Sequence, residues 1–120
     1  MPKSAAYVTI QDETVTLQSG PTDSQTFTFD TPDVVVARES VLSYVADPFG
    51  DNTVSIEWLL NGTNILTHSF DTAMARSLQE IVGKDLLKAT GNELEVRITD
   101  TNGSGSIKLD DIVLLYTHKS

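Results

Sequence analysis

Residues 53–70 read TVSIEWLLNGTNILTHSF, and this stretch contains the clearest structural signal in the sequence. Apolar side chains occupy alternate positions from 54 to 60, with polar ones between them at 55 and 57, which is the pattern of a strand with one buried face. Asn61-Gly62 follows, and this dipeptide readily adopts the positive φ angles of a two-residue hairpin turn. The stretch therefore predicts a β-hairpin with strands at 53–60 and 64–70.

Similar strand patterns fill most of the remaining chain. Short runs that alternate, or that are rich in β-branched and aromatic residues, are separated by turns containing Gly, Pro, Asn and Asp. Many short strands with regularly spaced turns predict an antiparallel sandwich or barrel. We expect a single all-β domain over residues 1–120. The predicted strands outside the hairpin span 7–10, 14–18, 26–29, 33–37, 40–46, 93–99 and 106–116.

Three stretches resemble the galactose-binding-like jelly roll, the β-sandwich of many carbohydrate-binding modules. SIEWLLNGTNILTHSF (55–70) resembles the family's unit of strand, Asn-Gly turn and strand. KDLLKATGNELEVRI (84–98) matches a family segment in its leucines and in Gly91-Asn92, and GSGSIKLDDIVLLY (103–116) resembles the closing strand. The resemblance covers residues 40–116 and implies an antiparallel jelly-roll β-sandwich with at most one short helix.

Residues 71–91 fit two interpretations. Met74, Leu78, Ile81 and Val82 fall at helical spacing, and the following glycine is suited to ending a helix. The resemblance instead implies a strand at 77–82 followed by one helical turn near 85–88. A β-sandwich with one short helix is compatible with both interpretations.

The family resemblance also implies a function. It indicates a non-catalytic, lectin-like module that holds a glycan on loops at one end of the sandwich or on its concave sheet. Many relatives carry a structural calcium near the N- and C-terminal strands, and Asp110 matches the family's C-terminal acidic position. The nearest N-terminal partners are Glu13 and Asp12. Other relatives serve as docking or assembly domains, so the alternative is a protein-interaction domain that assembles with itself or within a larger complex.

The segment ADPFGDNT (46–53) places an aromatic residue between two predicted strands, where turns are usually polar. Its proline and glycine favour an ordered reversal with Phe49 near the apex. Because strand connections lie at the surface, this ring either folds back over the end of the core or contacts a ligand. In the second interpretation, Asp47, Asp51 and Asn52 supply the hydrogen bonds that a sugar needs around a stacked ring.

Two further features have both a structural and a functional interpretation. Trp58 packs in the core or stacks on a sugar, and its apolar neighbours in register favour the core. Asp110-Asp111 interrupts an apolar run. In the structural interpretation this pair forms a bulge or edge that discourages aggregation, and in the functional interpretation it donates oxygen to calcium.

Composition argues against several classes of function. Eight Lys and Arg against 17 Asp and Glu give a net charge of -9, which disfavours binding to nucleic acid or to anionic membranes. The absence of Cys removes disulfides, thiol catalysis and Cys-based zinc sites. No apolar run is long enough to span a bilayer, and the first ten residues lack the pattern of a secretory signal. His68 and His118 accompany no nucleophile motif, so we expect no enzyme.

Overall fold

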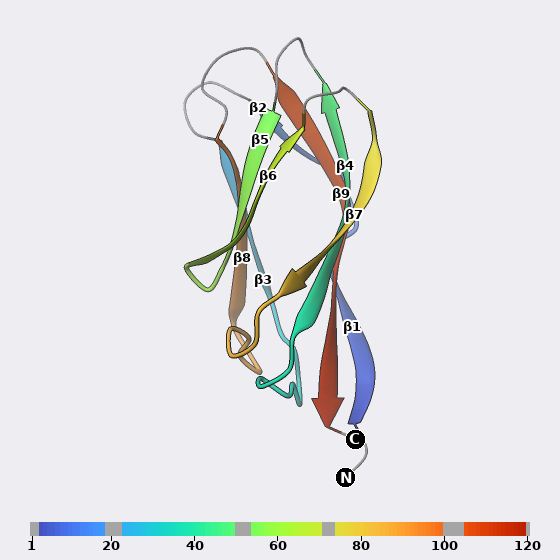
Figure 1. The fold of residues 1–120 in the computed structure, drawn as a ribbon, viewed down its shortest axis with the longest axis vertical. Coiled ribbons are helices and arrows are strands. Elements are labelled where there is room, and N and C mark those ends of the chain that lie inside the picture. The colour runs from blue at the N-terminus through green and yellow to red at the C-terminus, as the bar shows by residue number, and fades with distance from the viewer. Residues whose placement is uncertain (1–2, 19–22, 50–53, 71–73, 100–104, 120) are drawn as a thin grey trace.

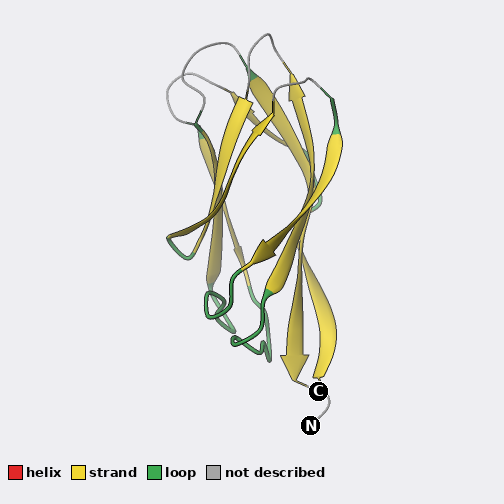
Figure 2. Cartoon of the chain, in the orientation of Figure 1, coloured by secondary structure: helices red, strands yellow, loops and turns green. Residues whose placement is uncertain are grey.

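The computed structural model describes residues 3–18, 23–49, 54–70, 74–99 and 105–119. These residues form two antiparallel sheets packed face to face (Figure 1). Within these ranges the chain consists of strands, turns and loops, with no helix (Figure 2). Correspondingly, they contain no helix that is long and apolar enough to cross a membrane.

The order of the strands is that of a jelly roll. One sheet, sheet A, has the order β1-β9-β4-β7, and β2 also pairs with β9; the other, sheet B, has the order β3-β8-β5-β6. β1 pairs with the later half of β9 and β2 with its earlier half, so the two share one position in sheet A. The strands are β1 (Lys3–Gln11), β2 (Val15–Gln18), β3 (Ser24–Phe29), β4 (Ser40–Phe49), β5 (Val54–Leu60), β6 (Thr63–Phe70), β7 (Arg76–Val82), β8 (Asn92–Ile98) and β9 (Ser106–Lys119).

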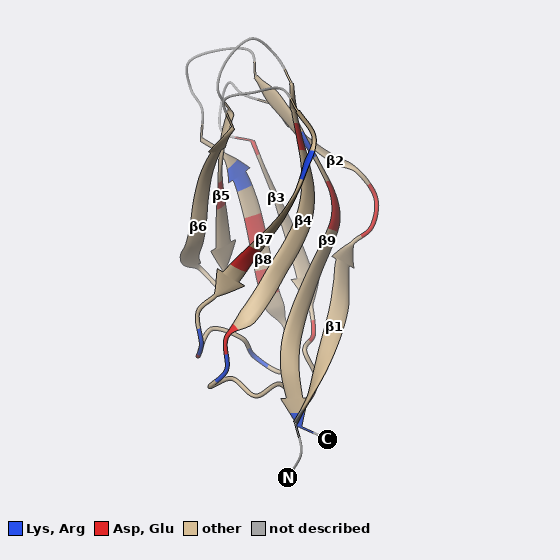
Figure 3. Cartoon of the chain, turned by 45° about the vertical axis from the view of Figure 1, so that its right-hand side comes forward, with Lys and Arg blue, Asp and Glu red and all other residues tan. Residues whose placement is uncertain are grey.

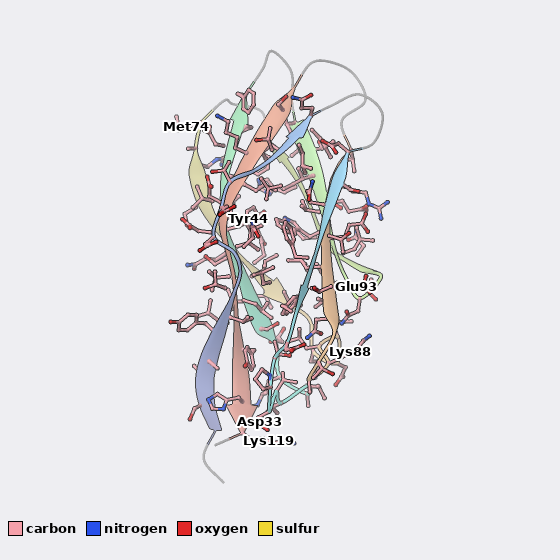
Figure 4. All side chains as sticks on the ribbon, turned by 180° about the vertical axis from the view of Figure 1, so that it is seen from behind. Asp33, Tyr44, Met74, Lys88, Glu93 and Lys119 are labelled. Atoms are coloured by element: carbon pink, nitrogen blue, oxygen red, sulfur yellow. The ribbon has the colours of Figure 1, made fainter. Side chains whose placement is uncertain are left out.

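The core lies between the two sheets and follows from strict alternation along the central strands. Every second residue of β5 is buried, which confirms the pattern predicted for the hairpin. Trp58 is fully buried and its ring centroid lies 4.9 Å from that of Tyr44 on β4, so the alternative that Trp58 stacks on a sugar is wrong. Figure 4 shows side chains, Tyr44 among them, filling the space between the sheets. Burial raises the pKa of Tyr44 to about 12, with a smaller lowering by Trp58 and a smaller rise from the Glu80 carboxylate.

The predicted Asn-Gly turn is confirmed. Leu60 pairs with Thr63, which leaves Asn61 and Gly62 as a two-residue loop with φ angles of 50° and 85°. Positive φ at both positions matches the right-handed twist of the two strands that the turn connects.

The helical interpretation of residues 71–91 is wrong. Arg76–Val82 is strand β7, whose Leu78 pairs with Tyr44 and whose Ile81 pairs with Val41. The helical spacing misleads because Ile81 points to solvent, whereas a helix would have buried it with its neighbours. The helical turn expected near 85–88 is also absent, since a hydrogen-bonded turn at 84–85 leads into irregular chain up to β8.

The strand expected at 33–37 is likewise not formed. Val34 makes only an isolated bridge with His118. The backbone around it turns instead, because Asp33 has a φ of 58° and the amides of Val34 and Arg38 bond to carbonyls three residues earlier. The apolar run is therefore a tight loop whose Val34 still packs into the core.

Two asparagines join the loops at the lower end of the sandwich in Figure 1. The Asn92 side chain is fully buried and makes four hydrogen bonds. Its Oδ1 accepts hydrogen bonds from the Lys88 amide (2.8 Å) and from Asn61 Nδ2 (3.1 Å). Its Nδ2 donates hydrogen bonds to the Lys88 carbonyl (2.7 Å) and to Thr31 Oγ1 (3.2 Å). Asn61 also donates to the Leu86 carbonyl at 2.8 Å. One buried side chain thus closes three loops, which explains why Gly91-Asn92 belongs to a signature of the fold.

Candidate ligand-binding site

Phe49 is the last residue of β4 at the upper end of the sandwich (Figure 1), and it does not occupy the middle of a loop. The strand continues past the predicted end at residue 46 because Pro48 is buried and lies opposite Ile107 of β9. Among the described residues, pairing of β4 with β7 ends at Ala46, so at Pro48 the strand has a described partner on one side only, a position where proline is tolerated. Asp51 and Asn52 lie outside the described residues.

The Phe49 ring lies on the outer face of sheet A, where β9 supplies its neighbours. Alternation along β4 turns Pro48 inward and Phe49 outward. Phe49 pairs with Ser106 and Asp47 pairs with Lys108, and the Lys108 ammonium lies 5.4 Å from the centroid of the Phe49 ring. The ring is 39% exposed and is not part of the core cluster. The structure therefore brings Asp47 and Phe49 together, as expected, and adds a lysine.

Sequence reasoning missed Lys108. Its only signal is its place as a polar residue between two buried ones in SIKLDD (106–111), and this pattern describes any outward position of a strand. Its proximity to Phe49 arises from the pairing of two strands almost 60 positions apart in the sequence. β2 extends the surface on the other side, since Thr16 also pairs with Lys108.

The arrangement suits a small polar ligand with an apolar face. A half-exposed aromatic ring can stack on such a face, and the cation beside the ring stays within the range of a cation–π contact. The Asp47 carboxylate accepts hydrogen bonds and the Lys108 ammonium donates them. One ring flanked by a donor and an acceptor is the minimum needed to orient a sugar.

The predicted metal ligands lie where β9 passes from β2 to β1. Val113 lies opposite Ser43 and Asp110 opposite Val45, so Asp111 and Ile112 together face one residue of β4. This is a β-bulge, and Asp111 has the positive φ of 52° that such an irregularity allows. The structural interpretation of Asp110-Asp111 as a bulge is therefore confirmed.

The described residues supply too few ligands for calcium on their own. Asp110 accepts a hydrogen bond from the Thr14 hydroxyl, and Asp12 and Glu13 are exposed in the connection between β1 and β2. Nowhere in the described part of the chain do three or more acidic, His or Cys side chains gather as a metal site. Calcium takes six to eight oxygens, so backbone carbonyls and water would have to provide most of them.

The outer face of sheet B is a less suitable place for a sugar. Arg97 Nε lies 3.3 Å from Glu57 and Arg97 Nη2 lies 3.4 Å from Glu95, while Asn64 donates to Glu57 and lies 3.5 Å from Thr67. These charged and polar groups pair with one another, and no aromatic ring stands among them. His68, on the edge strand β6, lies against Phe70 with ring centroids 4.4 Å apart, as expected for a residue at the rim.

No protein-family model matches the sequence, and no curated protein resembles it significantly. Solved structures share its fold at low identity. The chain resembles dimeric latent PorU from Porphyromonas gingivalis (TM-score 0.62, 11% identity), covering 93% of its own length but only 13% of that chain. It resembles the CBM36-1 domain of a multidomain xylanase from the hindgut metagenome of Trinervitermes trinervoides (TM-score 0.58, 9% identity, 98% of both chains). It also resembles the carbohydrate-binding module CBM36 in complex with calcium and xylotriose (TM-score 0.54, 8% identity, 98% of this chain and 99% of that one). The predicted jelly roll of the carbohydrate-binding-module type is confirmed as a fold.

Proposed function

We propose that the chain is a non-catalytic carbohydrate-binding module that holds a glycan at the upper end of sheet A. The observation that carries this proposal is the cluster of Phe49, Asp47 and Lys108 on one outward surface. Its jelly-roll fold supports the proposal, because two of the similar structures are carbohydrate-binding modules and one of them holds xylotriose. Asp51 and Asn52 follow Phe49 by two and three positions in the sequence, and we include them in the proposed site.

The chemistry of the cluster favours a neutral glycan. The ring of Phe49 offers apolar area to the C–H face of a sugar, and desolvation of that face supplies the driving force. Lys108 and Asp47 carry opposite charges and pair with each other across β9 and β4. They therefore add hydrogen-bonding groups without adding local net charge. The chain as a whole has a net charge of -9, which repels polyanionic chains.

A glycan array with the purified protein, followed by titration calorimetry with the best ligand, tests this function. We expect binding to neutral oligosaccharides, loss of most affinity in Phe49→Ala, and a smaller loss in Lys108→Ala. Glu93→Ala is the matched control, because Glu93 is exposed on the outer face of sheet B and should leave binding unchanged. Unchanged glycan binding in Phe49→Ala, or no binding to any glycan by the parent protein, would overturn the proposal.

Calcium is a subsidiary part of the proposal. Asp110 and Glu13 are the side chains that we assign to it, near the Thr14 hydroxyl that already bonds to Asp110. A similar structure that contains calcium supports looking for the ion here. Because most ligands would be carbonyls and water, we expect weak binding and a structural effect only.

A further inference from the structure

The outer face of sheet A carries a broad surface without charge. Below the bulge at Asp111, the outward side chains of β1, β9, β4 and β7 form two rows in register across all four strands, and a third row spans β1 and β9 only. We call this surface the neutral face, and it comprises Ala5, Tyr7, Thr9, Val41, Ser43, Gln79, Ile81, Val113, Leu115 and Thr117. In Figure 3 the lower parts of β9 and β1 are drawn in the colour of uncharged residues up to their ends, where Lys3 pairs with Lys119.

The central row of this face is apolar from one edge of the sheet to the other. Tyr7 pairs with Leu115, Leu115 pairs with Val41, and Val41 pairs with Ile81. Tyr7 is 73% exposed, Ile81 68% and Leu115 42%. Four apolar side chains thus form one contiguous line across the sheet, whereas exposed apolar residues of monomeric proteins are usually scattered singly.

The contrast with the rest of the surface indicates what kind of partner fits. The chain has 17 acidic residues, and the outer face of sheet B carries Glu57, Glu93 and Glu95 beside Arg97. Two copies of a protein with this net charge repel each other wherever acidic surfaces meet. The neutral face lets two copies approach without placing carboxylates opposite carboxylates.

We propose that the neutral face binds a second copy of this chain, face to face. A two-fold axis lying in the interface and passing through the central row places that row against its own copy, so apolar side chains meet apolar side chains. Pairing through the edge strand β7 is a poorer route, because Glu80 points inward between Leu78 and Val82 on the same face of that strand. An inward-pointing charge on an edge strand is a known means of preventing strand addition.

The size of the face predicts a weak dimer. Strands spaced by about 4.8 Å and outward rows spaced by about 7 Å give the ten positions of the face about 340 Å² on each copy. The total of about 700 Å² is below that of a stable specific interface, so we expect a weak dimer in rapid, reversible exchange. Salt should strengthen the dimer, because it screens the repulsion between the two negative chains.

Sedimentation equilibrium up to about millimolar protein, at low and high sodium chloride, tests the inference. The parent should dimerise, more tightly at high salt, and Ile81→Glu and Tyr7→Glu should each weaken the dimer at least tenfold. Thr28→Glu is the matched control, because it adds the same charge at an exposed position on the outer face of sheet B and should leave the dimer intact. Melting curves establish that each variant is folded.

A parent protein that stays monomeric at all concentrations overturns the inference, as does a folded Ile81→Glu variant that dimerises like the parent. A third outcome also overturns the inference: the protein stays monomeric and adsorbs to an insoluble neutral polysaccharide, and Ile81→Glu abolishes this adsorption. The neutral face would then be a surface that binds glycan. Because the Phe49 cluster lies above the neutral face, Ile81→Glu should leave the affinity for soluble glycans unchanged. Failure of this inference is thereby distinguishable from failure of the proposed function.

Discussion

At the lower end of the sandwich the side chains of Asn61 and Asn92 make hydrogen bonds to each other and to a neighbouring loop. At the upper end Phe49, Asp47 and Lys108 lie on the outer surface, and the contact among them is a cation above a ring. A buried polar group costs free energy unless it is paired, so the lower end stabilises the fold only as a complete network. The exposed groups of the upper end are free to exchange their water for a ligand.

This difference separates the residues of the fold from those of the candidate site. Two of the three stretches that carry the family resemblance contain Asn61-Gly62 and Gly91-Asn92, which lie at the lower end, where the backbone and the loops determine the residue type. Phe49 at the upper end is partly exposed and lies outside the core cluster, so it contributes little to the core. Function on a shared fold is carried by such surface positions.

Asn92→Ala should have the largest effect on stability. It removes four hydrogen bonds and takes the acceptor from the part-buried Lys88 amide, while the Lys88 carbonyl keeps the hydrogen bond from the Thr31 hydroxyl. We expect a loss of roughly 2–4 kcal/mol in the free energy of unfolding, measured by urea denaturation. Asn64→Ala is the control, since Asn64 is exposed and its loss should cost well under about 1 kcal/mol. Equal effects of the two substitutions would contradict the role assigned to the lower end.

Gly62→Val should come next. Nothing lies within 4 Å of a Cβ added at Gly62, so its φ of 85° is the sole reason for a penalty. We expect a loss of roughly 1–3 kcal/mol in thermal or urea unfolding. Gly83→Val has the same open surroundings without a positive φ and should be tolerated. If the two variants melt alike, the backbone conformation of the turn does not limit stability.

Phe49→Ala should cost less stability than either, because the ring is partly exposed and lies outside the core cluster. We expect about 1 kcal/mol, well below the roughly 3–5 kcal/mol that truncation of a core Phe costs. Differential scanning calorimetry distinguishes the two cases. A sharp fall in melting temperature would mean that Phe49 closes the end of the core, and the contrast between the two ends would then disappear.

Calcium should have the smallest effect. With a weak site, millimolar calcium should stabilise the parent by about 1 kcal/mol or less relative to EDTA. Asp110→Asn should lose this response, whereas Asp85→Asn, a substitution at the lower end, should retain it. Melting curves that overlay in EDTA and calcium would show that the calcium prediction is wrong.

Several features could be predicted from the sequence because their causes are local. The Asn61-Gly62 turn depends on two residues that tolerate positive φ, and the burial of Trp58 depends on alternation within one strand. The same reasoning predicted the sandwich and the proximity of Asp47 to Phe49, which are neighbours in the chain. Local preference and final structure agree at these positions.

Other features depended on contacts between distant segments. Residues 76–82 have a helical pattern but pair as a strand, because the edge of β4 offers seven partners in register from Ser40 to Ala46. The residues at 33–37 have a strand pattern but form a loop, because their pairing with the end of β9 is limited to the single bridge between Val34 and His118. Lys108 meets Phe49, and Tyr7 lines up with Ile81, only through the strand order of sheet A. The local preference of a residue for helix or strand is worth tenths of a kilocalorie per mole. Strand pairing and burial add up over the whole sandwich, so tertiary structure decided the outcome wherever it disagreed with local preference.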